Sequence, residues 1–223
     1  MGSGVSSTTV IIVVTVVIVV VMIGEYVARI AMRNRQFNKL QRLLADQDYE
    51  AFRTAIDSRL SRWVFPAYNR TYFKLSAAIM QDDFEETYRL LDELLQARVN
   101  KEQRTDLVYK AFNIYISQED KKNAAAMLKE IKTWEDEKAQ PVKRDCIRTY
   151  DIVILKKSDH IKEMKEELEG LSGQARGHAE HLIALQYENL GDTEKRDEYL
   201  RRAMDDSFTS IAPSDPEKKE GEA

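Results

Sequence analysis

The sequence predicts an all-α protein in which about five helical hairpins form an α-solenoid behind one membrane-spanning helix. Glycine and proline are scarce, with 8 Gly and 4 Pro among 223 residues, and an all-β chain of this length would need more turn formers. Apolar residues recur at steps of three and four through most of the chain, as they do along one face of an α-helix. An uncharged, almost wholly apolar run covers residues 10–23.

Residues 9–25 form the predicted transmembrane helix, which follows a short N-terminal segment, residues 1–8. Only Thr15 interrupts the apolar run, and the uncharged window exceeds the roughly 18 residues that mark a candidate span. A lone span must be helical, because lipid offers no partner to backbone polar groups. One alternative is a cleaved signal peptide, but this would need a basic leader and a small-residue cleavage site, and neither is present. Another alternative is a buried core strand, which would not explain the basic residues that follow the run. Residues 1–6 formally fit an N-myristoylation pattern, but a spanning helix makes that lipid redundant.

Residues 26–36 form a basic juxtamembrane helix, and the flank sets the predicted orientation. Residues 26–45 contain five basic side chains and no acid, so the positive-inside rule places the C-terminal body in the cytoplasm and the N-terminus outside. A single-pass anchor on a short repeat array is most typical of a bacterial inner-membrane protein. No Gly or Pro follows Gly24 in this region, so one helix can run from the anchor into the first hairpin, but the sequence leaves this continuity open. The expected membrane-flanking residues are Tyr26, Arg29, Arg33, Arg35 and Lys39.

Residues 37–204 form the predicted repeat domain. Five turn-like strings share an aspartate that lies between two apolar helical stretches, and an aspartate is a favourable N-cap for the helix that follows it. Breakers between the pairs include Pro66, Pro141 and the glycines of residues 170–177. Each unit is therefore predicted as helix, turn, helix. The five aspartates are Asp48, Asp83, Asp120, Asp159 and Asp192.

The fifth unit, residues 179–204, resembles a tetratricopeptide repeat. Ala184 stands where a small residue lets two helices cross, Tyr187 follows one turn later, and Gly191 and Asp192 form the turn, with Ala203 late in the second helix. The third unit is a weaker match, and the resemblance extends over about residues 37–204. The chain departs from the family where Arg196 replaces the usual alanine, where Leu75 and Phe112 replace small residues, and where the unit-ending proline is missing. An irregular helical bundle with helices of similar length is the alternative.

Charge and residue chemistry argue against several other functions. Residues 205–223 hold six of the 38 acids and two of the 34 basic residues, which leaves residues 25–204 neutral with 32 charges of each sign. A neutral body lacks the basic surface that nucleic acid requires, so no nucleic-acid partner is expected. The acidic tail is polar and is expected to be disordered. The single cysteine, Cys146, excludes an intramolecular disulfide framework and a multi-cysteine metal site.

No catalytic group of residues stands out in the sequence. His178 and His181 lie one helical turn apart but lack a third ligand nearby other than acids, so no metal site is expected. Lys143, Arg144 and Arg148 could lower the pKa of the Cys146 thiol, yet no histidine base is adjacent in sequence, and a half-buried structural cysteine is the simpler interpretation. We expect no enzyme activity, no cofactor and no small-molecule substrate.

The resemblance implies a membrane-anchored, cytoplasmic scaffold or adaptor that binds a protein or peptide partner on a concave face. In such stacks the first helix of each pair lines that face, which combines aromatic and polar side chains here. The alternative is an auxiliary subunit of a membrane complex that docks mainly through its transmembrane helix. The expected partner-binding residues are Asn69, Tyr72, Ser76, Tyr109, Asn113, Arg148 and His181.

Overall fold

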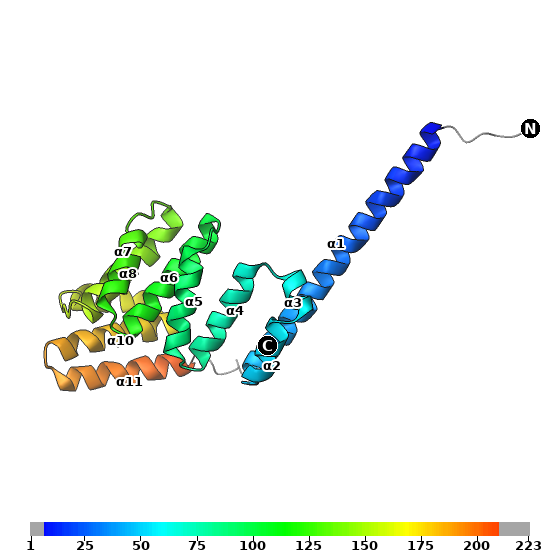
Figure 1. The fold of residues 1–223 in the computed structure, drawn as a ribbon. Coiled ribbons are helices and arrows are strands. Elements are labelled where there is room, and N and C mark those ends of the chain that lie inside the picture. The colour runs from blue at the N-terminus through cyan, green and yellow to red at the C-terminus, as the bar shows by residue number, and fades with distance from the viewer. Residues whose placement is uncertain (1–6, 210–223) are drawn as a thin grey trace, which may run out of the picture. The chain divides into compact units, whose positions relative to one another are not determined.

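The structure is a computed structural model that describes the backbone of residues 7–209 and the side chains of residues 15, 16 and 18–205. Every regular element in this described range is a helix, so the predicted all-α class is confirmed (Figure 1). The chain forms two compact units, residues 1–99 and 100–223. Their boundary falls inside the range that the sequence predicts as one repeat domain. Residues 1–6, which include most of the predicted N-terminal segment, and the acidic tail beyond residue 209 lie outside the description.

Helix α1 runs without a break from Ser7 to Ala45. The structure therefore answers a question that the sequence left open, because the apolar run and the start of the first hairpin belong to one helix. Within the part of the chain that the structure describes, no helix combines the length and the apolar character needed to cross a bilayer. Residues 10–14 and 17 of the predicted span have side chains outside the described set.

The first unit consists of the C-terminal part of α1 and four shorter helices. These are α2 (Tyr49–Ile56), α3 (Arg59–Val64), α4 (Ala67–Met80) and α5 (Phe84–Gln96). Helices α2 and α3 contact α1 and α4, and α5 packs on α4. The core between α1, α2, α3 and α4 buries aliphatic and aromatic side chains, so this part of α1 belongs to the body of the unit. The buried members are Leu40, Leu44, Phe52, Ala55, Ile56, Val64, Phe65 and Ala77.

The second unit contains α6 (Lys101–Ser117), α7 (Lys121–Ile131), α8 (Gln140–Val153), α9 (Ile161–Glu167), α10 (Gly173–Asn189) and α11 (Thr193–Thr209). Short 3₁₀ turns, η1 (Glu137–Ala139) and η2 (Leu168–Gly170), precede α8 and follow α9. Helix α7 packs on α6, α11 packs on α10, and both α8 and α9 contact α10. A core that includes Ile152, Met164, Ile183 and Tyr199 joins α8, α9, α10 and α11. Helix α11 extends beyond residue 204, where the predicted repeat domain ends.

Four of the five predicted aspartate turns have the same geometry. The Asp carboxylate accepts a hydrogen bond from the backbone N–H three residues later, at 3.0 Å for Asp48 and 3.1 Å for Asp83, Asp120 and Asp192. The backbone N–H of each Asp donates to the carbonyl five residues earlier, which closes the preceding helix. The residue before each Asp has a left-handed backbone, a conformation that glycine adopts without strain. These residues are Gln47, Asp82, Glu119 and Gly191, with φ of 57°, 51°, 48° and 76°.

The fifth turn, at Asp159, corrects the prediction. Helix α9 begins at Ile161 after His160, and no side chain caps it. The left-handed residue is Lys156, three positions before Asp159, because α8 ends at Val153 and a longer connection follows. No side-chain cap is made at the start of α9, and the carboxylate of Asp159 lies 3.4 Å from Nε2 of His160.

Candidate functional site

The first candidate surface is the apolar part of α1 that extends beyond the other helices of its unit (Figure 1). Residues 18–23 are all large, apolar and exposed, from 47% for Val19 to 64% for Met22. Six consecutive positions cover more than one full turn of 3.6 residues, so the helix is apolar on every side. A helix segment that is apolar all round is typical of a protein core or of a membrane span.

The predicted flanking residues all lie on α1 and are exposed, and Tyr26 is 68% exposed. Arg29 makes the contact that the sequence did not predict. Its Nη2 donates to the backbone oxygen of Trp63 at 3.0 Å, and its guanidinium carbon lies 5.2 Å from the centre of the indole. Trp63 belongs to α3, which was missed because a six-residue helix between two breakers has too few positions to show a period.

A buried polar network fixes α3 against α1. Gln36 is 5% exposed, and its Nε2 donates to Oγ of Ser61 at 2.9 Å and to the backbone oxygen of Ala55 at 3.2 Å. Ser61 is fully buried, and its Oγ donates to the same Ala55 oxygen at 2.7 Å. Buried polar groups with satisfied hydrogen bonds favour one arrangement of the elements that carry them. Helix α3 is therefore held in one orientation on α1.

Three of the predicted partner-binding residues belong to the first unit. Asn69, Tyr72 and Ser76 lie on α4 at steps of three and four, and all three are half-buried. Oγ of Ser76 donates to the backbone oxygen of Tyr72 at 3.2 Å, and the rings of Tyr68 and Tyr72 are 6.0 Å apart. These side chains form a partly accessible strip on one helix face.

A cavity of about 850 Å³ in the second unit lies between α6, the end of α7 and the connection to α8. Tyr109, one of the predicted residues, lines it with Trp134 and Val142. Arg104 and Glu130 also line this cavity. Nε and Nη2 of Arg104 each donate to one carboxylate oxygen of Glu130 at 2.7 Å. Asn113, one turn after Tyr109, is exposed on the same helix. The cavity thus offers aromatic contact area beside charged groups of both signs.

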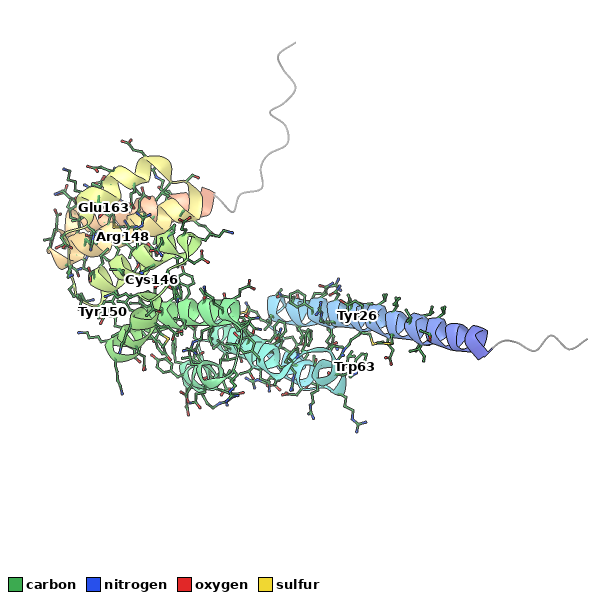
Figure 2. All side chains as sticks on the ribbon, turned by 90° about the horizontal axis from the view of Figure 1, so that it is seen from above. Tyr26, Trp63, Cys146, Arg148, Tyr150 and Glu163 are labelled. Carbon is green, nitrogen blue, oxygen red and sulfur yellow. The ribbon has the colours of Figure 1, made fainter. Side chains whose placement is uncertain are left out.

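Arg148 lies at a different cavity, of about 530 Å³, between α8 and α9. Figure 2 labels Arg148 and Glu163, two of the residues that line it. Its side chain is only 17% exposed, its Nη1 donates to Glu167 at 2.7 Å, and its Nη2 lies 3.5 Å from Asp145. Burial raises the pKa of Asp145, but the hydrogen bond and charge of His178, with those of Arg148, outweigh burial and leave this pKa below its ordinary value. Arg148 therefore stabilises the unit through internal ion pairs. The described geometry leaves its Nε buried without a hydrogen-bond partner.

His181 and Cys146 complete the set of residues that the sequence singled out. His181 is exposed on α10, and desolvation together with the charge of His178 lowers its pKa. Cys146 is 1% exposed, and burial followed by the charge of Asp145 raises the pKa of its thiol to about 12. The neighbouring basic residues do not produce a reactive thiolate, and the interpretation of Cys146 as a structural residue agrees with its burial. Among the residues described, no group of three or more potential ligands could hold a metal ion.

The seven predicted partner-binding residues do not form one cluster within either unit. Asn69, Tyr72 and Ser76 belong to the first unit, and Tyr109 and Arg148 line two different cavities of the second. No family model matches the chain, and no curated protein or solved structure is similar to it. The resemblance of residues 37–204 to tetratricopeptide repeats, and the solenoid it implies, stay predictions.

Proposed function

We propose that the protein is a single-pass membrane protein whose helical body is a cytoplasmic scaffold or adaptor for a protein or peptide partner. The observation that carries this proposal is the exposed apolar surface of α1, which continues without a break into the core of the first unit. Exposed apolar area of this size costs free energy in water, at about 25 cal/mol per Å². Lipid removes that cost.

Length and flanking charge support the membrane as the environment. The predicted span, residues 9–25, rises by about 26 Å in a helix, against the roughly 30 Å of a bilayer core. Exposed Tyr26 and Arg29 follow at the position where aromatic and basic side chains favour the interface. The same basic flank favours a body on the cytoplasmic side and, for this architecture, a bacterial inner membrane.

The cavity at Tyr109 supports partner binding by the body. Its volume of about 850 Å³ and its mixture of aromatic, aliphatic and charged walls suit a peptide side chain with polar neighbours. In the proposed tetratricopeptide-like solenoid, Tyr109 and Asn113 lie on the first helix of the third pair, where partner contacts are expected. The alternative, an auxiliary subunit that docks through α1, rests on the same exposed valine and isoleucine side chains.

Membrane anchoring is tested with the full chain expressed in a bacterial host. We expect the protein to remain in the membrane pellet after extraction with alkaline carbonate. A cysteine introduced at Ser3 should react with an impermeant maleimide from outside the cell, and Cys146 gives little background because it is buried. Release of the full chain by carbonate would contradict the anchor, and labelling of Ser3→Cys only after lysis would reverse the orientation.

The two modes of partner binding are separated by two full-length variants once a partner has been crosslinked in native membranes. In the first, residues 10–23 become leucine, which keeps a span but changes its surface. In the second, Tyr109→Ala opens the cavity wall. Loss of the partner only with Tyr109→Ala supports the scaffold, and loss only with the leucine span supports the subunit. Truncation at residue 37 is a poor substitute, because it removes Gln36 and the network that holds α3.

A further inference from the structure

Helix α3 exposes a small apolar face that no other described helix of its unit covers. Ser61 and Val64 point into the core and are 0% and 6% exposed, whereas Leu60 and Trp63 are 40% and 49% exposed. The two exposed side chains are three residues apart, so they share one side of the helix. Exposed tryptophan is uncommon on a surface that meets only water, and its amphipathic ring favours interfaces between apolar and polar media.

The same face carries positive charge. Arg59 and Arg62 on α3 are exposed, as are Arg29 and Arg33 on the adjoining stretch of α1. The acids near them are Glu25, which is exposed on α1, and Asp57, whose carboxylate is paired with Lys74 at 2.8 Å. The surface around Leu60 and Trp63 therefore has a net positive charge.

The position of α3 along α1 matches the headgroup layer of a bilayer. Arg29, which holds Trp63, lies five residues after Gly24, a rise of about 8 Å along the helix. The polar layer adds roughly 5–8 Å to each side of the hydrocarbon core. Figure 2 shows Trp63 beside the stretch of α1 that carries Tyr26. The two aromatic side chains thus lie where an aromatic belt is expected.

The fixed orientation of α3 makes this placement specific. Gln36, Ser61 and the Ala55 carbonyl lock the inner face of α3 onto the core, so Trp63 cannot turn inward without breaking buried hydrogen bonds. The unit therefore presents Leu60 and Trp63 on its outer surface.

We propose that α3 is a second membrane contact, in which Leu60 and Trp63 enter the interface and the four arginines pair with anionic phospholipid headgroups. This inference rests on the proposed membrane anchor. Basic side chains next to a membrane surface attract anionic lipid, and interfacial aromatic residues add apolar burial. Together α1 and α3 hold the first unit against the bilayer at two points.

The test uses full-length protein with Trp134→Phe, which leaves Trp63 as the single tryptophan of the chain. The protein is reconstituted into vesicles of phosphatidylcholine alone or with about one third phosphatidylglycerol, and flotation measures anchoring in each sample. Quenching of Trp63 by acrylamide and by lipids brominated at shallow or deep acyl positions then measures its depth. We expect shallow-label quenching, and at least a twofold drop in acrylamide quenching when phosphatidylglycerol is present.

Charge dependence is tested with Arg59→Gln/Arg62→Gln, which should abolish the effect of phosphatidylglycerol. A matched control, Arg98→Gln/Arg144→Gln, removes two exposed arginines elsewhere and should keep the effect. If the protein floats but Trp63 stays open to acrylamide in both vesicles, the α3 contact is refuted while the anchor stands, and the face is left for a protein partner. If the protein does not float, the anchor and the α3 contact both fail.

Discussion

Removal of the Asp120 carboxylate should weaken α7 locally. Oδ1 of Asp120 accepts from the backbone N–H of Asn123 at 3.1 Å, and Oδ2 accepts from Nδ2 of the same residue at 2.7 Å. Asp120→Ala removes both bonds and leaves the first-turn N–H groups of α7 without this acceptor. Asp159→Ala changes the corresponding residue of the next unit, where no cap exists. The sequence alone treats the two aspartates as equivalent.

The size of the effect follows from the hydrogen bonds that are lost. An N-cap is worth about 1 kcal/mol, within a range of about 0.5–2 kcal/mol. The second bond, from Nδ2 of Asn123, is partly buried and takes the expected loss to about 1–2 kcal/mol. A loss of this size raises the population of the locally open state about 5- to 30-fold.

Hydrogen exchange of the full-length protein, followed by mass spectrometry, measures this population for each helix. We expect amides of α7 to exchange about 5- to 30-fold faster in Asp120→Ala and nearly at the original rate in Asp120→Asn, because asparagine is also a good N-cap. Asp159→Ala should leave the exchange of α9 unchanged. Equal effects of Asp120→Ala and Asp159→Ala, or no effect of either, would refute the assignment of the turns.

Three further predictions concern the second unit. Cys146 should resist iodoacetamide at pH 8 in the folded chain and react in denaturant, since the pKa of its thiol is about 12; ready labelling of folded protein would contradict its burial. Because the folded-state pKa of Asp145 lies below its ordinary value of 3.8, this carboxylate stabilises the unit above about pH 4, and that stability is lost as the pH falls through the folded-state pKa. Asp145→Asn should therefore lower the urea midpoint at pH 6, and this decrease should become smaller as the pH falls below 3.8. A decrease of the same size at every pH would show that the charge is not responsible. A double-mutant cycle on Arg104 and Glu130 should give a coupling energy of about 1 kcal/mol that decreases with added salt, because the ion pair is bidentate but about one-third exposed. A coupling energy near zero would show that the pair does not contribute to stability.

The helices and most of their turns could be predicted because the responsible signals are local. A short stretch of sequence is enough to show that apolar residues recur at steps of three or four. It is also enough to show an aspartate such as Asp120, whose N–H partner is only three residues later. The same locality explains the error at Asp159, where the connection is longer and the string looks the same. Helix α3 was missed because its six residues are too few to show a helical period.

The candidate sites depended more on contacts between distant residues. Arg148 was predicted to face a partner, but Glu167, 19 residues later, occupies part of its guanidinium. No periodicity reveals which carboxylate a given arginine meets. Trp134 lies in an irregular connection, so only the folded chain shows that it shares a cavity with Tyr109. The arginines of α1 can be singled out from composition alone, whereas the contact of Arg29 with Trp63 becomes visible only in the fold.

The four capped aspartate turns share one backbone geometry although the residue before the aspartate differs. Gly191 occupies the left-handed position in one copy, and Gln47, Asp82 and Glu119 occupy it in the other three, although a side chain there costs roughly 1 kcal/mol. The hydrogen bonds are unchanged in all four copies, so the aspartate and the closing backbone bond are sufficient to define the turn. A glycine–aspartate pair is therefore too strict a search pattern for this architecture. Related repeats in other chains are better sought by an aspartate that ends one helix and caps the next, whatever residue precedes it.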